Sequence, residues 1–453
     1  MFKITRVART DTIESFSPPS FSTESKIKQR NALGDMFSFP TLPNEVQQLA
    51  GNLPLSALIE FIDVPAKLHI YELTSSVPLW NWPITPVGAR TLLAKHNNST
   101  FCSLDRPEKS AVLECFDGRH GDRYPSSTPT TTRLWASMRE ACHEVSNSHP
   151  NMRDPLNRCH TLDVLFLSDI RPQTTSEDSQ QCWHPFSKQN SLRYNLTCIL
   201  GWASWCGLVV LAIFSRLGFA AAYLLLMPIC GLVIGYTHGG RGRVPIRRKR
   251  NPHDRLVVAT DSVNACDWWA FYGDHNLVNP LLNMPLSRPK HMRRQSPFFL
   301  WILRVLIIGQ WALALGSCAF QGWDAIFISF WITFCACMSS YAYPTDVAVQ
   351  DWMLYRVGVE VRKIRVKVSS RRALLSTLVC LNPDDCTSWM DSILTKSPER
   401  QQWEQTLISH LQAKQVYMNV SNASEYWWKY IQEGLQVGAA VKEALDKIQT
   451  QER

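Results

Sequence analysis

The sequence lacks the short motifs that carry most familiar enzyme chemistry. It contains no GxSxG nucleophile elbow, no HExxH zinc helix, no GxxxxGK[ST] phosphate loop and no GxGxxG dinucleotide turn. These patterns place a nucleophile, a pair of zinc ligands or a cradle of backbone N–H groups, so the enzyme classes that depend on them have no support here. We therefore predict no catalytic residue, no cofactor and no metal site, and we favour a protein that is not an enzyme.

Paired cysteines are also missing. The 14 Cys include no CxxC pair, and several fall inside apolar stretches, which favours buried free thiols over a disulfide framework or a zinc ribbon. The neighbours Cys142-His143, Cys159-His160 and Cys182-Trp183-His184 could supply metal ligands if they folded together. Their irregular intervals favour coincidence.

The N-terminal stretch lacks the apolar core of a secretory signal. Residues 1–16 read MFKITRVARTDTIESF, in which basic residues are followed directly by acidic ones. Residues 1–40 are rich in Ser, Pro and charge, which predicts a disordered tail. We expect the first half of the chain to stay in the cytosol.

Charge is nearly absent from two long blocks, at 196–236 and 297–343, and each block contains a polar break. A helix of about 20 residues crosses the roughly 30 Å hydrocarbon core of a bilayer, and a soluble helix would need a polar stripe that these segments do not have. Backbone groups inside a bilayer must be satisfied within the segment, which favours helices over strands. The prediction is a mainly α protein with four transmembrane helices in two hairpins: 196–214, 217–236, 297–320 and 325–343.

Basic residues crowd both ends of the loop between the hairpins, 237–296. Because Lys and Arg are retained on the cytosolic side, this loop is predicted to be cytosolic, and an even number of spans places both termini there too. The organelle is not indicated. Sequons at Asn97, Asn98, Asn195, Asn419 and Asn422 would then stay unglycosylated. The cluster that sets this orientation comprises Arg241, Arg243, Arg247, Arg248, Lys249, Arg250, Arg293 and Arg294.

The RRKR run at 247–250 resembles a nucleic-acid patch, but its place beyond a span favours anionic lipids of the cytosolic leaflet as the partner. No nucleic-acid partner is predicted. A homo-oligomer or a protein partner is possible.

The remaining chain is predicted to form a small cytosolic α+β domain at 41–170, a linker at 171–195 and a cytosolic helical tail at 344–453. Within the tail, 356–372 fits either a helix on the membrane surface or a strand, and helices are expected after Ser397 and over 424–449. The local signals in the N-terminal domain are strands at 67–73, 110–116 and 161–167 and a helix at 132–145.

Two sets of residues in and between the spans could carry a specific role. Small residues at helical spacing allow close helix packing; they are Gly231, Gly235, Gly239, Ala312 and Gly316. The loop 254–286 offers a speculative site at the membrane interface, formed by Asp267, Trp268, Trp269, Asp274 and His275. Solvated carboxylates are the simpler interpretation of its acids, and its aromatic residues fit either the lipid headgroup level or a hydrophobic core.

Two stretches, ATDSVNACDWWAFYGD and RRALLSTLVCLNPDDCTSWMDSILTKSPERQQWEQTL, resemble those of uncharacterised multipass membrane proteins of filamentous fungi. That resemblance covers about residues 190–415 and implies membrane residence but no chemistry. Three hypotheses remain: a non-enzymatic scaffold at the cytosolic membrane face, a membrane-embedded enzyme using 254–275, and an oligomeric channel or transporter.

Overall fold

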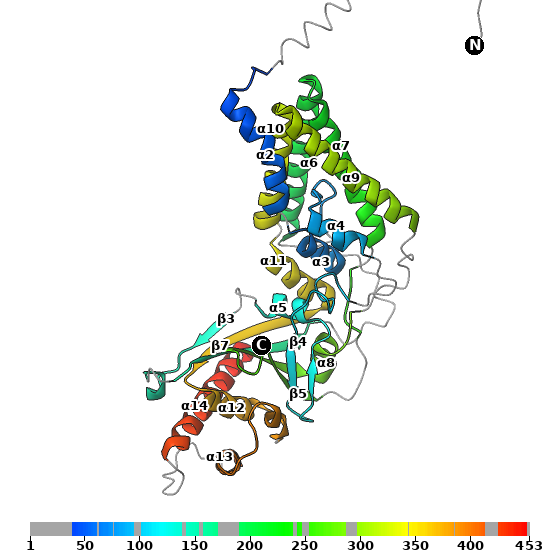
Figure 1. Ribbon diagram of the computed structural model, residues 1–453. Helices are drawn as coiled ribbons and strands as arrows, with labels where there is room; N and C mark the ends of the chain where they lie inside the picture. Colours follow the sequence, from blue (N-terminus) through cyan, green and yellow to red (C-terminus); the bar gives the residue numbers. More distant parts are fainter. Residues whose placement is uncertain are drawn as a thin grey trace, which may run out of the picture.

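The protein is described from a computed structural model, and it is mostly helical with one mixed sheet. Figure 1 shows a helical bundle joined end to end with a domain that contains the sheet. The structure describes residues 39–60, 63–75, 77–94, 101–137, 142–153, 157–170, 190–238, 242–246, 253–286, 297–342, 344–384, 386–412 and 425–450. Residues 1–38 of the predicted tail at 1–40 and residues 171–189 of the predicted linker at 171–195 lie outside these ranges, and residues 190–195 of that linker are helical.

Four helices of the bundle are long and apolar enough to cross a membrane, as predicted. They are α6 (Asn190–Phe214), α7 (Gly218–His238), α9 (Pro297–Phe320) and α10 (Trp323–Cys337), the last extended by η3 (Met338–Ala342). Large apolar side chains point outward from them, including Ile199, Leu232, Trp301 and Ile308. An aqueous surface seldom carries so much contiguous apolar area, whereas a lipid-facing surface requires it.

Each pair of helices is joined by a tight turn. Arg216 and Gln321 both adopt positive φ, at 58° and 49°, which ends the first helix of each hairpin in a left-handed cap. Asp324 Oδ1 accepts the backbone N–H of Ala220 at 2.8 Å, so a residue in the first turn of α10 caps the start of α7.

Helix α7 contains Pro228, which has no N–H to donate to the carbonyl of Leu224 one turn earlier. The indole Nε1 of Trp205 in α6 donates to that carbonyl oxygen at 2.8 Å. This bond satisfies the freed backbone group and ties α6 to α7.

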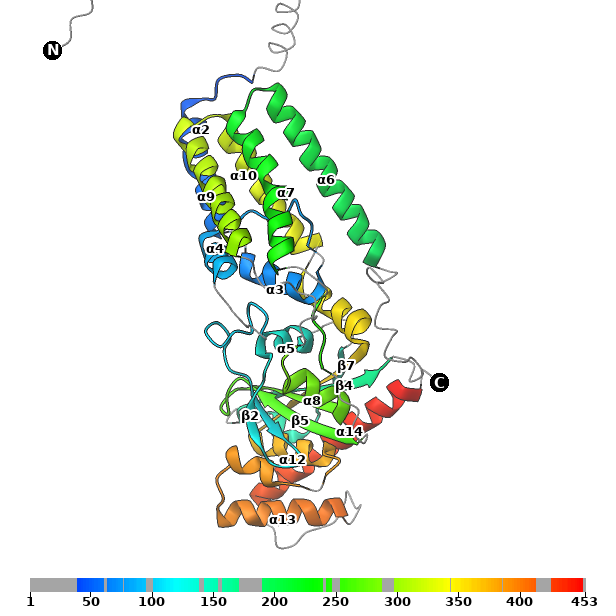
Figure 2. The ribbon, with the colours of Figure 1, turned by 90° about the vertical axis from the view of Figure 1, so that its right-hand side faces the viewer.

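A further helix, α2 (Asn44–Glu60), packs along α9 and α10. The chain leading into it is held at the start of α10, where Trp323 Nε1 donates to the Pro40 carbonyl at 2.8 Å and Phe39 stacks on the Trp323 ring. In Figure 2, α2 runs from the end of the bundle that is remote from the sheet toward α3 and α4 at the other end.

Residues 77–85, here called the inserted segment, fill the centre of the bundle without helical structure. They connect α3 (Val64–Thr74) with α4 (Pro86–Leu93). Trp80, Trp82 and Ile84 are fully buried among the residues of α7, α9 and α10. Non-helical backbone at membrane depth is tolerated only where protein surrounds it, so its polar groups need specific partners.

Gln310 of α9 supplies several of those partners. Its Oε1 accepts the Ile84 N–H at 3.1 Å, and its Nε2 donates to the Trp82 carbonyl at 3.3 Å and to Cys230 Sγ at 2.9 Å. Trp311 Nε1 donates to the Ile84 carbonyl at 2.8 Å. At about 1.5 Å of rise per residue, Gln310 lies roughly 15–20 Å from either end of α9, near the middle of the helix.

Lysine 67 anchors the same segment from α3. Its Nζ donates to the Asn81 carbonyl at 3.2 Å and to Asn81 Oδ1 at 2.9 Å, and Asn81 Nδ2 donates to Ser339 Oγ at 3.1 Å. These bonds join α3, the inserted segment and the end of α10.

The described strands form one seven-stranded sheet in the order β2-β1-β5-β6-β4-β7-β3. Its strands are β1 (Glu114–Asp117), β2 (Arg123–Pro125), β3 (Cys142–Val145), β4 (His160–Asp169), β5 (Asp254–Thr260), β6 (Asp267–Asp274) and β7 (Val359–Val368). The long strand β4 pairs with β6 in parallel and with β7 antiparallel. Segments before, between and after the two hairpins therefore contribute to a single sheet.

Alternate residues of the sheet enter two hydrophobic cores. One face, with Leu162, Val164 and Trp268, packs under α12 (Arg371–Leu381), η5 (Ser388–Ser392), α13 (Pro398–Gln412) and α14 (Glu425–Thr450). The opposite face, with Leu165 and Phe271, packs under α5 (Pro129–Ala136), α8 (His275–Leu282), α11 (Thr345–Asp351) and η4 (Trp352–Val357). This second layer lies between the sheet and the bundle (Figure 1).

Several local predictions are corrected by the structure. Residues 67–73, expected as a strand, lie within α3, because Asp63 accepts the Ala66 N–H and Pro65 occupies the first turn. The helix expected over 132–145 ends at Ala136, and Cys142–Val145 is strand β3. Residues 356–372 contain strand β7 and not a surface helix. The strand expected at 161–167 lies within β4, and the C-terminal helices form where predicted.

Candidate functional site: a buried ionisable cluster

Six ionisable side chains meet where α3 leaves the bundle and approaches the sheet domain. They come from α3, from the loop at 101–110 and from the short segment after α7. All are buried, with exposed fractions between 0% and 7%: His69, Glu72, Cys102, Asp105, Arg106 and Arg243. We call this set the junction cluster. Lys, Arg, Asp and Glu are rarely buried without a specific role, so this cluster is the leading candidate site.

Aspartate 105 fixes the loop against α5. Its Oδ1 accepts the backbone N–H groups of Thr130 at 2.7 Å and Thr131 at 3.0 Å, in the first turn of that helix. The exposed backbone N–H groups of a helix start favour an anionic acceptor there. Its Oδ2 accepts the Thr131 hydroxyl at 2.5 Å.

Histidine 69 is held as a neutral imidazole in this network. The Leu104 N–H donates to Nδ1 at 3.3 Å, and Nε2 lies 3.1 Å from Thr131 Oγ1. Because the Thr131 hydroxyl donates to Asp105, its oxygen is free to accept from Nε2–H. Burial lowers the pKa of His69 below its usual value, which agrees with a neutral ring.

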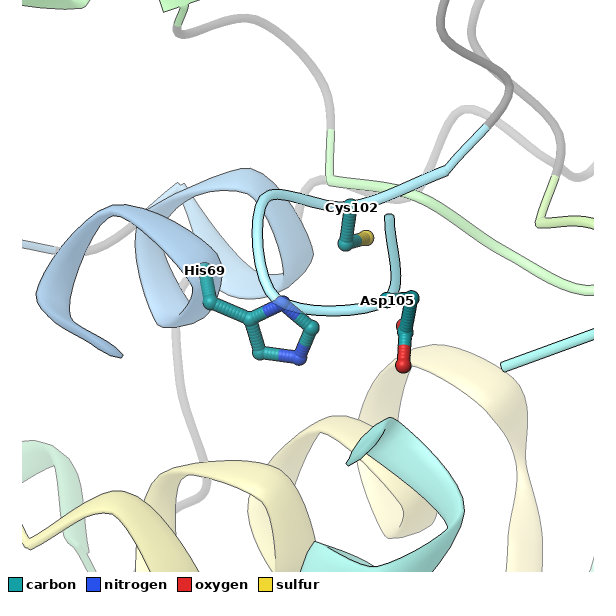
Figure 3. A group of neighbouring side chains, drawn as sticks. All are labelled: His69, Cys102 and Asp105. Carbon is teal, nitrogen blue, oxygen red and sulfur yellow. The ribbon is translucent and has the colours of Figure 1, made fainter. Parts of the chain in front are cut away.

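Figure 3 shows His69 from α3 facing Cys102 and Asp105 from the loop. One potential ligand atom of each lies within 4.8 Å of the others, which is the geometry of a possible metal group. The chemistry does not fit a cation well. Both imidazole nitrogens already have hydrogen-bond partners, burial raises the pKa of the Cys102 thiol well above its usual value, and two arginines lie nearby.

Glutamate 72 is shared between the loop and the segment after α7. Its Oε2 accepts the Ser103 N–H at 2.8 Å and lies 3.7 Å from an Arg243 guanidinium nitrogen. The Trp352 indole donates to the Arg243 carbonyl at 2.8 Å. These contacts connect α3, the exit of α7 and η4.

Arginine 106 stands apart in this cluster. Its exposed fraction is 5%, and its Nε and Nη1 have no hydrogen-bond acceptor in the part of the chain that the structure describes. The backbone around it is ordered, since the Arg106 carbonyl accepts the N–H groups of Lys109 and Ser110 at 2.8 and 2.9 Å. Two buried guanidinium nitrogens without acceptors need an explanation, because each unmet group costs about 1–3 kcal/mol or more.

The speculative interfacial site at 254–275 does not assemble. Asp267 is exposed at the start of β6, and Trp268 is buried in the sheet core. Asp274 caps α8 by accepting the Asn276 N–H at 3.0 Å, and His275 Nδ1 lies 3.0 Å from Arg255 Nη1. Trp269 packs at the edge of the other core. The residues have separate structural contacts because the loop is a β-hairpin whose successive side chains point to opposite faces.

The remaining predicted residues are distributed as follows. Arg243 is buried in the junction cluster, whereas the other basic residues of the predicted topology cluster lie outside the described residues. A Cβ on Gly231 would lie 2.2 Å from the Leu79 carbonyl oxygen, so this glycine allows the inserted segment to approach α7. A Cβ on Gly316 would lie 2.7 Å from Phe219 of α7, and one on Gly235 would lie 3.1 Å from the Tyr71 hydroxyl. Ala312 is exposed, and Gly239 lies outside the described residues.

Sequence reasoning missed the junction cluster. Its members are separated by up to 174 positions, from His69 to Arg243, and no motif connects them. One signal was available: Asp63 and Pro65 mark a helix start, and a helix over 64–74 places Lys67, His69 and Glu72 within a largely apolar run. No known protein family, no characterised protein and no solved structure matches the chain, so none suggests a role for the cluster.

Proposed function

We propose that the chain is an integral multipass membrane protein that acts as a non-enzymatic scaffold, holding one composite domain at the cytosolic face of a membrane. The observation that carries the proposal is the interleaving of the sheet. Strands from before, between and after the two hairpins pair with one another, so both ends of each hairpin return to the same domain. The domain and its membrane anchor are thereby one structural unit.

The packing of the bundle supports anchoring over transport. Its centre is filled by Trp80, Trp82 and Ile84, and the polar groups of the inserted segment are bonded to Gln310, Trp311 and Lys67. A conduction path needs polar side chains that line an open route, whereas the apolar side chains of Trp80, Trp82 and Ile84 occupy the interior of the bundle.

The sheet also supports an orientation. Because its strands lie on both sides of each hairpin in sequence, the seven strands share one side of the membrane, and the basic loop favours the cytosol. The expectation that the N-terminus lies in the cytosol changes. Since α2 runs along the bundle and Phe39 contacts Trp323 at the remote end, we place residues 39–43 on the opposite side.

Two measurements test the scaffold. Alkaline carbonate washing of membranes should leave the full chain in the pellet. A photo-reactive residue at Gln405, exposed on α13, should then form protein adducts in intact membranes, while the same residue at Ile308 on the lipid-facing side of α9 should form lipid adducts.

A lipid and metabolite profile of cells without the protein separates scaffold from enzyme. The scaffold predicts no substrate that accumulates together with a product that disappears. Such a matched pair, restored by re-expression, would refute the proposal, as would release of the chain by carbonate.

A further inference from the structure

We infer that the junction cluster binds a phosphate group through Arg106, as part of a ligand that the membrane boundary or the adjoining cytosol supplies. The inference rests on the proposed function only for the lipid source of that phosphate. The juxtaposition that suggests it is a buried guanidinium, two of whose nitrogens have no acceptor among the described residues, beside a second buried arginine just after an apolar helix long enough to span a membrane.

The acceptors within the cluster are already engaged. Both Asp105 oxygens receive donors from α5, and Glu72 receives the Ser103 N–H and faces Arg243. Among the described residues, two nitrogen atoms of Arg106, Nε and Nη1, therefore have no acceptor, although Glu72 attracts the charge of the guanidinium. A water molecule could accept from one of these nitrogens, whereas two oxygens of an oxyanion could accept from both.

The geometry of a guanidinium favours an oxyanion. Its nitrogens form a rigid planar fork that matches two oxygens of a phosphate or carboxylate, and such bidentate pairs are among the strongest charge-assisted hydrogen bonds. Arg243 adds a second positive charge to the same region. The two arginines also explain why the cluster is better suited to an anion than to the metal that His69, Cys102 and Asp105 suggest.

The position of the cluster identifies phosphate as the oxyanion. Helix α7 has 21 residues, so it rises about 30 Å and ends at His238 near the edge of the hydrocarbon core. Arg243 follows shortly after that end, and its backbone N–H donates to the Glu72 carbonyl at 3.4 Å. This is the depth at which lipid phosphates lie and to which soluble phosphate compounds also have access.

The test uses the full chain purified in detergent, and it follows thermal unfolding in the presence of three probes. These are inorganic phosphate, a short-chain phosphatidic acid and the diacylglycerol with the same acyl chains. Stabilisation by phosphatidic acid alone assigns a lipid source, and stabilisation by inorganic phosphate as well assigns a soluble one. Equal stabilisation by diacylglycerol and phosphatidic acid would overturn the inference, as would no stabilisation by any probe.

Arg106→Gln should weaken the apparent affinity for the effective probe about 10- to 100-fold, the loss expected for a charge-assisted bidentate contact. Arg123→Gln is the matched control, because Arg123 is an exposed arginine paired with Glu114 at the edge of the sheet. If Arg106→Gln does not fold, Arg106→Lys keeps the charge without the fork and should also bind more weakly. Unchanged affinity in the Arg106 variant would refute the site. A chain released by carbonate that still binds phosphate through Arg106 would refute the proposed function alone.

Discussion

Substituting Gln310 tests whether the inserted segment depends on a single side chain for its backbone hydrogen bonds. In Gln310→Leu the new side chain has a volume similar to that of Gln310, but the Ile84 N–H and the Trp82 carbonyl lose their hydrogen-bond partners inside the bundle. A buried polar group without a partner costs about 1–3 kcal/mol. The Trp82 bond is long at 3.3 Å, and Trp311 still binds the Ile84 carbonyl, so we expect a total loss of about 2–4 kcal/mol.

The assay is thermal unfolding of the full chain in detergent, followed through its intrinsic tryptophan fluorescence. For a chain of this size, the expected loss corresponds to a fall of about 2–4 °C in the apparent melting temperature. Ile308→Leu, at an exposed position of the same helix, is the control and should have the same melting temperature as the wild type. Equal melting temperatures for Gln310→Leu and the control would refute the described hydrogen bonding of the inserted segment.

Four further predictions concern other parts of the molecule. Glu433→Ala should destabilise the domain by about 3 kcal/mol, because Glu433 accepts hydrogen bonds from Asn147, Asn151 and Ser369. Hydrogen exchange of the backbone amides in α14 measures this loss, and Glu443→Ala, at an exposed position of the same helix, should have little effect on it. Gly231→Val should reduce the amount of folded protein recovered from membranes, since its Cβ would overlap the Leu79 carbonyl, while Gly207→Val, with open space around it, should not. Burial lowers the pKa of His69 in the folded chain, so the unfolded chain takes up a proton at a higher pH than the folded chain does. The contribution of neutral His69 to stability is therefore complete above about pH 6.5 and is lost as pH falls from that value toward the folded pKa. The fall in melting temperature between pH 7 and pH 5 should be smaller for His69→Gln than for the wild type. A glycosylation sequon in a tag before residue 1 should be modified and the same tag after residue 453 should not; modification of neither tag would contradict the placement of α2.

The four long apolar helices could be predicted closely because their signal is local. Long runs without charge have few alternatives, and the predicted limits lie within a few residues of the observed helices. The C-terminal helices were similarly marked, with Ser397 Oγ accepting the Arg400 N–H at the start of α13.

The arrangement of the sheet and the cluster could not be predicted in the same way. Strand β4 pairs with β6 and β7, whose residues lie about 100 and 200 positions later, and alternation within each strand says nothing about its neighbours. Residues 67–73 look like a strand because α3 is buried on nearly all sides and shows no clear polar stripe. The burial of the inserted segment depends on partners that lie far apart in sequence, since Lys67, Gln310 and Trp311 all bind its polar groups.

The order in which the ribosome delivers the strands limits how this molecule can be made. Strand β4 is synthesised before the first hairpin, yet both of its neighbours emerge only after one or two of the apolar hairpins have been made. Until then its backbone edges are exposed and available to other chains, a condition that promotes aggregation. A nascent chain truncated before residue 359 should therefore bind chaperones and be degraded rapidly, even though it has all four long apolar helices.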